Sequence, residues 1–340
     1  MTVDSNTLVR IALPIKPWIA FSASQMKHRD AIQAALNDGT LTMEHSICFC
    51  GETKGLAVAR YDCWGFAIPT VMCRHCYALR SAFFFDEASM AKFYGGGFYH
   101  AHMFTSASAG VGMSEVEYQQ EEETKGRTIY DWIADKTDLA KVKSVLDVGC
   151  GVGGVLGYFS ARGYRVHGCD FVGEYIEHAR RRVVGGDFRV GGLEQFRDAE
   201  VFDLVILSDV VEHLRNPLQL LRELRHFLHP GSLVFINVPG VFGISNFRFR
   251  CSFRYFTKIE HTWCHTRRSL TLLMQMAGYE LASGSEAVFA LFRPAPHAKP
   301  DFPGIGYAFS LLTFLASLPI RRILKLDSVL RAVRRRLRGH

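Results

Sequence analysis

The chain has 340 residues, of which 48% are hydrophobic and 21% charged, and its formal net charge is +7 at neutral pH. This length gives room for about two domains, since a domain usually takes roughly 100–200 residues, and the ordinary composition excludes a generally disordered protein. The charge is confined to the C-terminal end, because residues 321–340 contain eight lysines and arginines against Asp327 alone. The rest of the chain is neutral overall, which argues against a nucleic-acid-binding body.

Residues 1–44 form an N-terminal segment with little pattern. Within it, residues 28–39, HRDAIQAALNDG, predict a short helix that ends at Gly39. The first residues, MTVDSNTLVRIALPIKPW, lack the basic start and the continuous apolar core of a signal peptide. We therefore expect a cytoplasmic protein.

Four closely spaced cysteines mark residues 45–105 as a second segment. They are Cys48, Cys50, Cys73 and Cys76, and 22 residues separate the two pairs. Without an export signal, such pairs are typical of metal ligands rather than disulfides, and four thiolates can hold one tetrahedral Zn²⁺. Cys63 or His75 could replace one ligand, and the alternative is that the reduced cysteines are buried as small apolar side chains.

The next stretch is rich in aromatic residues and then in glutamates. Residues 85–104, FDEASMAKFYGGGFYHAHMF, predict a helix that breaks at Gly95–Gly97. Residues 106–126 predict a linker followed by an exposed acidic helix whose glutamates face solvent.

From about residue 128, apolar runs alternate with segments of helical period. KSVLDVG, YRVHGCD, FDLVILSD and SLVFINVP read as strands, and the segments between them read as helices. This β-α-β order predicts a parallel, doubly wound sheet. Residues 269–293 add one more helix and two late strands.

The first of these strands leads into a glycine-rich turn, SVLDVGCGVGGVLGYF at 144–159. Gly149, Gly151 and Gly153 fit G-x-G-x-G, and with Gly154 the turn also fits G-x-G-x-x-G. Glycines allow a sharp turn and a close approach of a ligand to the main chain. The pattern alone is compatible with a dinucleotide, a nucleotide phosphate or S-adenosylmethionine.

Two acids narrow the choice of ligand. Asp147 ends the first strand, where it would repel a pyrophosphate but attract a sulfonium ligand that carries an ammonium group. Asp170 ends the next strand, 19 residues beyond Gly151, where a carboxylate can accept hydrogen bonds from both ribose hydroxyls. The pair therefore favours S-adenosylmethionine.

At this point the chain resembles the class I S-adenosylmethionine-dependent methyltransferases. The resemblance covers about residues 125–295, through VLDVGCGVGG, FDLVILSDVVEHLRNP (202–217), LHPGSLVFINVP (228–239) and HTRRSLTLLMQMAGYE (265–280). It implies an α/β fold: a doubly wound, Rossmann-like sheet of seven strands with the last one antiparallel.

The resemblance also implies a set of ligand-binding positions. Gly192 stands where the family often has an acid that contacts adenine, so backbone groups near Leu193 are expected to hold that ring. Asp209 is expected beside the methionine end of the ligand, and its alternative role, as the cap of the helix VVEHL, is compatible with that position. The expected cofactor-binding residues are Asp147, Gly149, Cys150, Gly151, Gly153, Asp170, Phe171, Leu193, Asp209 and Val210.

The cysteine segment is similar to a small zinc-binding domain that precedes certain bacterial methyltransferases. Those relatives act on nucleotide-linked sugars and polysaccharide precursors, and their zinc would be structural because four cysteines leave no open position. The aromatic and histidine side chains near this segment either line the acceptor cleft or pack in a core. They are Phe93, Tyr94, Phe98, Tyr99, His100, His102 and Phe104.

Methyl transfer to a hydroxyl, an amine or a carbon acid needs a base, and histidine suits that role near neutral pH. His213 and His261 compete for it. His261 lies in the insert that binds the acceptor in the resembled family, and Glu260 would orient it. Sugar C-methyltransferases carry Tyr-x-Glu-His there, but this chain has Lys258 in place of the tyrosine, which leaves O- and N-methylation equally open.

Residues 303–340 form an apolar and then basic tail. The apolar run at 307–319 is too short to span a membrane, which takes about 20 residues, and we expect Pro319 to break it. Beyond it, apolar residues at helical spacing alternate with arginines, which predicts a basic amphipathic helix. That helix either lies on an anionic membrane surface or packs on the body of the protein.

The leading hypothesis is a methyltransferase for a small molecule or a glycan, such as a nucleotide-linked sugar or a polysaccharide precursor. One alternative is an RNA methyltransferase whose zinc ribbon binds RNA, although residues 45–80 carry no dense basic stripe. Another is a non-catalytic sensor of an adenosyl ligand at the membrane, which the intact glycine and acid positions disfavour.

Overall fold

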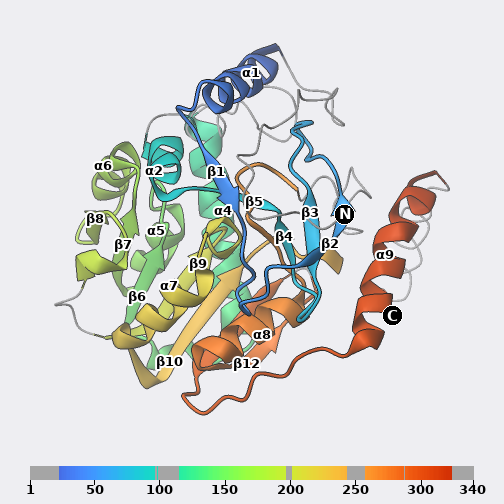
Figure 1. Ribbon diagram of the computed structural model, residues 1–340. Helices are drawn as coiled ribbons and strands as arrows, with labels where there is room; N and C mark the ends of the chain where they lie inside the picture. Colours follow the sequence, from blue (N-terminus) through green and yellow to red (C-terminus); the bar gives the residue numbers. More distant parts are fainter. Residues whose placement is uncertain are drawn as a thin grey trace.

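A seven-stranded sheet lies at the centre of the larger part of the molecule (Figure 1). The computed structural model describes residues 23–95, 98, 115–196, 201–242, 257–286 and 288–323. The sheet contains β6 (Ser144–Val148), β7 (Arg165–Asp170), β8 (Asp187–Val190), β9 (Phe202–Ser208), β10 (Leu228–Asn237), β12 (Tyr279–Gly284) and β13 (Phe289–Pro294).

The strand order is β12-β13-β10-β9-β6-β7-β8. Strands β10, β9, β6, β7 and β8 pair in parallel, whereas β13 is antiparallel to both of its neighbours. The predicted doubly wound, Rossmann-like sheet with an antiparallel last strand is therefore confirmed. The order reverses next to β6, and ligands of such sheets bind at the carboxyl ends of the strands at this switch point.

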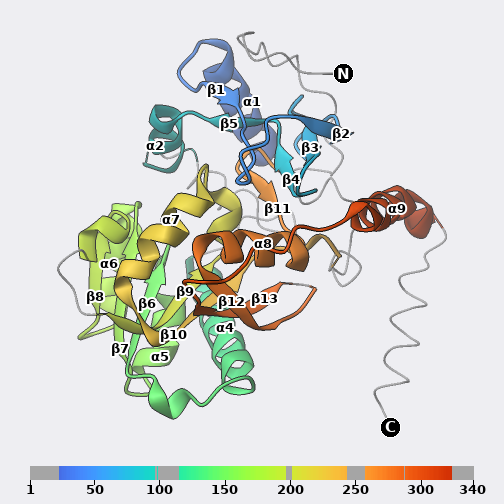
Figure 2. The same cartoon turned by 60° about the horizontal axis from the view of Figure 1, so that its bottom comes forward.

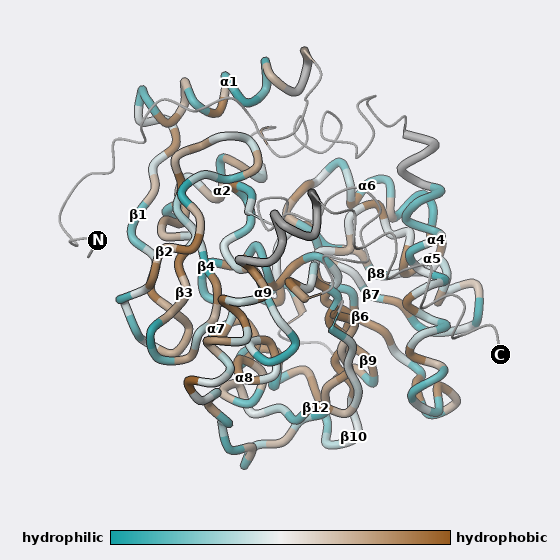
Figure 3. Tube along the Cα trace, turned by 90° about the vertical axis from the view of Figure 1, so that its right-hand side faces the viewer, coloured by the Kyte–Doolittle hydropathy of each residue, from teal (hydrophilic) through white to brown (hydrophobic). Residues whose placement is uncertain are grey.

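Helices cover both faces of the sheet. Neighbouring residues of β9 belong to different clusters, Val205 to one face and Ile206 to the other, as expected for a strand with period two that is buried on both sides. One face packs against α7 (Pro217–Leu224) and α8 (Arg267–Ala277), and the other against α4 (Glu115–Ala134), α5 (Gly154–Ser160) and α6 (Gly173–Arg182). Short 3-10 helices lie at Leu139–Lys141, Leu193–Phe196, Val211–His213 and Arg225–Phe227. Hydrophobic colour follows the strands in Figure 3, and hydrophilic colour follows outer helices such as α4.

The smaller part, built from the N-terminal residues, packs above the carboxyl ends of the large sheet (Figure 2). It contains α1 (Ala23–Asn37), β1 (Met43–His45), β2 (Gly55–Ala59), β3 (Thr70–Cys73), β4 (Leu79–Ser81), β5 (Phe83–Phe85) and α2 (Glu87–Gly95). Strands β1 and β5 pair with each other, and a second sheet has the order β11-β4-β3-β2.

The two parts share a sheet. Strand β11 (Trp263–Cys264) belongs to the segment that follows β10, yet it pairs with β4 of the smaller part. The Ser81 amide also donates to the Thr262 carbonyl over 2.8 Å, and the Cys63 amide donates to the Thr257 carbonyl over 2.8 Å. The segment that contains His261 is therefore hydrogen-bonded to the smaller part of the molecule both before and after this residue.

Two expectations about the N-terminal helix and the acidic helix can be compared with the structure. The helix predicted at 28–39 is confirmed as α1, with Gly39 at φ 80° after its end. The exposed acidic helix predicted up to 126 is longer, since α4 continues to Ala134, and one of its faces is buried.

The predicted break at Pro319 is wrong, because α9 (Ile305–Ile323) runs through it. A proline removes one intrahelical hydrogen bond, and the turns on either side can still continue. The predicted basic amphipathic helix beyond Pro319 falls mostly on residues 324–340, which lie outside the described residues.

Candidate active site

The glycine turn connects β6 to α5 and has a left-handed backbone at three positions. Gly149, Gly151 and Gly153 have φ values of 77°, 51° and 76°, which side chains other than glycine rarely adopt. A Cβ atom on Gly149 would also lie 2.7 Å from Val210 Cγ2. The turn is therefore open to a ligand on one side and closely packed on the other.

The carboxylate of Asp170 is bound to the glycine turn. Its Oδ2 accepts a hydrogen bond from the Gly151 amide (3.0 Å), and its Oδ1 accepts one from the Val172 amide (2.9 Å). Burial raises the pKa of Asp170, and these two backbone donors oppose that shift. The side chain is thereby fixed at the end of β7, where the sequence places a ribose-binding acid.

Asp147 is buried at the end of β6. Only 2% of the residue is exposed, and its Oδ1 has no hydrogen-bond partner in the described part of the chain. Burial raises the pKa of this carboxyl group well above its usual range, although Lys125 opposes the shift. A buried acceptor without a partner is costly, so this position fits a ligand that brings a cation or a hydrogen-bond donor.

Lys125 of α4 enters the same region, and the sequence reasoning missed it. Its Nζ lies 2.9 Å from Asp209 Oδ2 and 3.6 Å from Glu122 Oε1. Burial alone would lower the pKa of Lys125, but the carboxylates of Asp209 and Glu122 raise it, so the side chain stays charged. Helix α4 thus adds a positive charge to the candidate site, where the only charged ligand-binding residues predicted from the sequence were aspartates.

Asp209 is not the cap of the helix that follows it. The 3-10 helix Val211–His213 has Val210 as its N-cap residue, without a side-chain capping bond. Asp209 itself has φ 56°, and its amide donates to the Asn237 carbonyl over 2.8 Å. This tight turn directs its carboxylate toward Lys125, so the capping alternative is wrong.

The remaining predicted ligand residues lie around the same strand ends. Phe171 is 68% exposed directly after β7, and Leu193 is buried at the start of a 3-10 helix. Cys150 is buried inside the turn, where burial raises the pKa of its thiol well above its usual value. The exposed ring of Phe171 is available to an adenine, whereas Cys150 is held in its neutral form.

The two candidate histidines come together. The rings of His213 and His261 are 4.8 Å apart and nearly perpendicular. His213 Nδ1 lies 3.1 Å from the Glu260 carbonyl oxygen, and its Nε2 lies 4.0 Å from Glu212 Oε1. The Glu260 carboxylate lies 3.6 Å from Lys258 Nζ. Glu260 therefore orients His213 through its main chain, a contact that the sequence did not predict.

His213 Nδ1 lies near two groups. It faces the Glu260 carbonyl oxygen, which can only accept, and the Tyr94 hydroxyl, which can donate or accept, so a neutral ring that donates from Nδ1 to Glu260 has its lone pair on Nε2. Burial lowers the pKa of His213, against the raising effect of Glu260 and Asp209. The ring is therefore neutral near pH 7 and can accept a proton at Nε2.

Tyr94 brings the smaller part of the molecule into the site. Its hydroxyl group lies 3.1 Å from His213 Nδ1, and the two rings are perpendicular. Burial raises the pKa of Tyr94 well above its usual value, so the hydroxyl stays protonated. By contrast, Phe93 is fully buried and stacks on Phe85, so this neighbouring aromatic packs in a core.

Of the other predicted aromatics, Phe98 stacks on Phe93, with ring centroids 6.4 Å apart. The remaining ones, Tyr99, His100, His102 and Phe104, lie outside the described residues.

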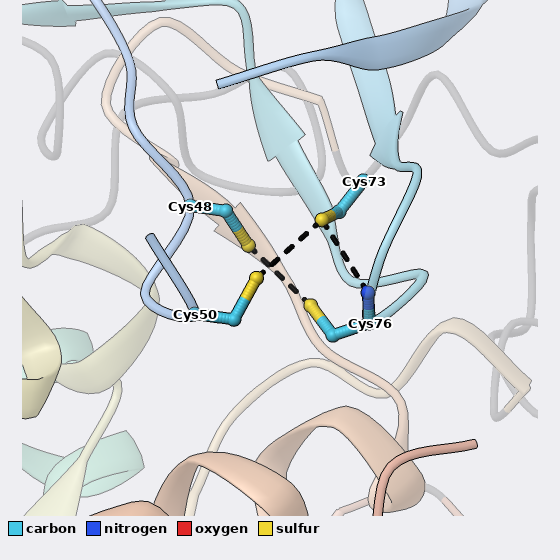
Figure 4. A group of neighbouring side chains, drawn as sticks. All are labelled: Cys48, Cys50, Cys73 and Cys76. Atoms are coloured by element: carbon cyan, nitrogen blue, oxygen red, sulfur yellow. Dashed lines mark hydrogen bonds between the residues drawn. The ribbon is translucent and has the colours of Figure 1, made fainter. Parts of the chain in front are cut away.

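The four predicted cysteines form one cluster, with their sulfur atoms pointing toward one another (Figure 4). Cys48 Sγ lies 3.4 Å from Cys76 Sγ, and Cys50 Sγ lies 3.6 Å from Cys73 Sγ. Four thiolates around a tetrahedral zinc with Zn–S bonds of about 2.3 Å would be about 3.8 Å apart, so the donor set fits that ion. His75, an alternative ligand, stacks on Phe302 instead.

No local pattern in the sequence marks Lys125 or Glu212 as a residue of the site. Lys125 looks like one charge within an acidic helix, and its role depends on α4 folding back onto the glycine turn. Glu212 is 2% exposed, but nothing in the local pattern distinguishes it from a surface glutamate. For Tyr94, the aromatic content of its segment was visible, although its contact with His213 was not.

Comparison with known proteins finds similarity to methyltransferases over the part of the chain that carries this site. Residues 118–283 match the family described as "Methyltransferase domain". A ubiquinone biosynthesis O-methyltransferase from Actinobacillus pleuropneumoniae serotype 5b is 33% identical over 118 residues, which cover 32% of this chain and 50% of that relative. Another, from Xanthomonas oryzae pv. oryzae strain PXO99A, is 32% identical over 126 residues, which cover 34% and 52%. The chain thus spans about half the length of these relatives.

Among solved structures, S-adenosylmethionine-bound CalS10, an amino pentose methyltransferase from Micromonospora echinaspora, is similar at 16% identity. The match covers 53% of this chain and 96% of that one, with a TM-score of 0.43.

Proposed function

We propose that the whole chain transfers a methyl group from S-adenosylmethionine to a small-molecule acceptor, because residues 118–283 match the methyltransferase-domain family and O-methyltransferases are similar over part of the same region. The acceptor class that we favour is a glycan precursor or a similar hydroxyl-bearing molecule. The two relatives named above are both ubiquinone biosynthesis O-methyltransferases, which supports an oxygen atom as the acceptor.

One observation carries the choice of cofactor: the buried Asp147 carboxylate has an oxygen without a partner in the described part of the chain. The ammonium group or the sulfonium charge of S-adenosylmethionine would satisfy it, whereas a pyrophosphate would be repelled. Lys125 would bind the carboxylate of the methionine part, and Asp170 would accept from the ribose hydroxyls. Gly149 and Gly151 keep the turn free of side chains, so the residues present fit this cofactor.

S-adenosylmethionine supplies a methyl group that is already activated by the sulfonium charge. The chain therefore has to align the acceptor, exclude water and remove a proton. We propose His261 as the base, with His213 beside it at a ring distance of 4.8 Å. A His213 ring that donates from Nδ1 to the Glu260 carbonyl would leave Nε2 able to accept a proton.

The smaller part of the molecule would close the acceptor side of this site. Tyr94 approaches the histidine pair from α2, and β11 joins the base-bearing segment to the small sheet. A structural zinc at Cys48, Cys50, Cys73 and Cys76 would hold that sheet together, because its strands are short and its cysteines come from two separate turns.

Peripheral contact with an anionic membrane surface through residues 306–340 is part of the proposal. Residues 321–340 carry the whole net charge of the chain, which supports attraction to anionic lipids. Among the described residues, no helix is both long and apolar enough to cross a bilayer.

The test is transfer of a labelled methyl group to a panel of hydroxyl, amine and nucleotide-sugar acceptors. His261→Gln should retain binding of S-adenosylhomocysteine and lose turnover by about 100-fold or more. His226→Gln is the matched control, because His226 is exposed and remote from the site, and it should leave turnover unchanged. Unchanged turnover in His261→Gln would remove this residue from the mechanism.

A further inference from the structure

An open apolar groove lies on the outer side of the smaller part, away from the methyltransferase site. It has a volume of about 360 Å³ and runs between the small sheet and helix α9. Its apolar lining includes Leu56, Met72 and Tyr77 from the sheet side and Ile305, Phe309 and Leu312 from α9. The only charged side chain in its lining, within the part of the chain that the structure describes, belongs to Arg74.

Helix α9 packs with one face and leaves the other in water. Ala308 and Leu311 are 3% and 0% exposed against Met72, Leu79 and Cys264. On the outer face, Ile305 is 65% and Phe309 66% exposed. In Figure 3, which looks at the molecule from this side, α9 lies in front of the sheets. The helix is therefore attached to the body while its outer face is available to a partner.

Two other apolar side chains are exposed, one in the same groove and one three residues before Ile305. Leu56 is 46% exposed at the sheet edge, and Phe302 is 38% exposed where it stacks on His75. A cluster of exposed apolar side chains is unusual on a protein surface and marks an interaction site more often than scattered single residues do. We call Leu56, Phe302, Ile305 and Phe309 the α9 patch.

Two basic residues lie at the sheet edge beside the α9 patch. Arg74 lines the groove, and its amide donates to the Lys54 carbonyl over 3.4 Å, so two basic residues lie at this sheet edge. The chain continues beyond Ile323 with 17 residues that include six lysines and arginines against one aspartate. An apolar surface with Arg74 and Lys54 at its edge is complementary to a bilayer with anionic headgroups.

We propose that the α9 patch and its groove form a docking site for an anionic phospholipid bilayer, in which a lipid hydrocarbon chain occupies the groove and Arg74 contacts a headgroup phosphate. A second copy of the chain fits less well, because it would place the same basic surface opposite itself. A spanning arrangement does not fit, since no described helix can cross a bilayer. The docking site rests on the membrane contact proposed above and assigns it to particular residues, whereas methyl transfer does not depend on it, so the docking site and the methyl transfer can each fail without the other.

Co-sedimentation of the full chain with vesicles tests the proposal. Wild-type protein should sediment with phosphatidylcholine vesicles that contain phosphatidylglycerol and remain mostly in solution with phosphatidylcholine alone. The double substitution I305D/F309D should lower the partition coefficient about tenfold, since it removes the exposed apolar anchors and adds two negative charges next to anionic lipid. The matched control is V184D, which places an aspartate at an 88% exposed apolar position in the loop between α6 and β8, and it should sediment as the wild type does.

Two further measurements keep the outcome interpretable. Thermal unfolding and binding of S-adenosylhomocysteine should be the same in I305D/F309D and in the wild type, because the substituted side chains face water. Arg74→Glu should weaken sedimentation in low salt and lose its effect in high salt. Equal sedimentation of I305D/F309D and wild type would overturn the proposal. So would a stable dimer of the wild type that the double substitution dissociates, because the α9 patch would then be a contact between copies.

Discussion

His265 should make the protein sensitive to mild acid. The residue is 1% exposed, its Nε2 has no hydrogen-bond partner in the described part of the chain, and its ring stacks on Trp263 at 6.3 Å. Burial lowers its pKa from 6.5 to about 3. The ring lies directly after β11, so its protonation would disturb the junction between the two parts of the molecule.

The sign and the size of the effect follow from the two pKa values of His265. Below pH 6.5 the unfolded chain binds a proton there, whereas the folded chain does so only near pH 3. The stabilisation from a neutral His265 is therefore complete above pH 6.5 and is lost as the pH falls toward 3. Between pH 8 and pH 5, the free energy of unfolding should decrease by about 2 kcal/mol from this group.

Urea unfolding at pH 8 and pH 5 measures this decrease. His265→Leu removes the titrating group, so its decrease between the two pH values should be smaller than that of the wild type by about 2 kcal/mol. Any constant cost of the substitution cancels in that difference. His226→Leu, at an exposed position, should keep the full wild-type decrease. An equal decrease in His265→Leu and wild type would refute the reasoning.

Three other predictions concern the site and its support. A Cβ on Gly154 would lie 2.4 Å from Glu122 Cβ, so Gly154→Ala should cost about 1–3 kcal/mol of stability and weaken cofactor binding. Gly157→Ala is the control, because a Cβ there would have its nearest neighbour at 3.6 Å and should be tolerated. Equal melting temperatures of the two variants would contradict the close packing of α4. Cys73→Ser should lose bound zinc in metal analysis by mass spectrometry while Cys63→Ala keeps it, and zinc-free wild type would exclude the metal centre. The Tyr94→Phe variant should bind S-adenosylhomocysteine normally, but its turnover should be lower by about tenfold or more, because His213 loses a hydroxyl partner at 3.1 Å. Unchanged turnover would limit the role of Tyr94 to packing.

The elements with strong local signals were predictable from the sequence. The glycine turn was one, because Gly149, Gly151 and Gly153 need φ values that few other residues adopt. The strand pattern was another, since apolar runs separated by helical segments are typical of a parallel sheet buried on both faces. The convergence of the four cysteines followed from their paired spacing.

The parts that were not predictable depend on contacts between distant segments. Lys125 becomes a site residue only because α4 packs against the glycine turn, with no room for a Cβ at Gly154. Strand β11 has two residues, too few to form a pattern, and it exists through its pairing with β4.

The contact between His213 and the Glu260 carbonyl is a third example, because it joins main chain to side chain across 47 positions. No periodicity encodes such a contact, so it could not be predicted from the sequence.

Isothermal titration calorimetry with S-adenosylhomocysteine and with NAD tests the central claim most directly. The pocket around Asp147 should bind S-adenosylhomocysteine at one site per chain and give no heat with NAD. Asp147→Asn should weaken that binding about tenfold, because an amide cannot replace the charge that faces the ligand. Binding of NAD without binding of S-adenosylhomocysteine would contradict the account.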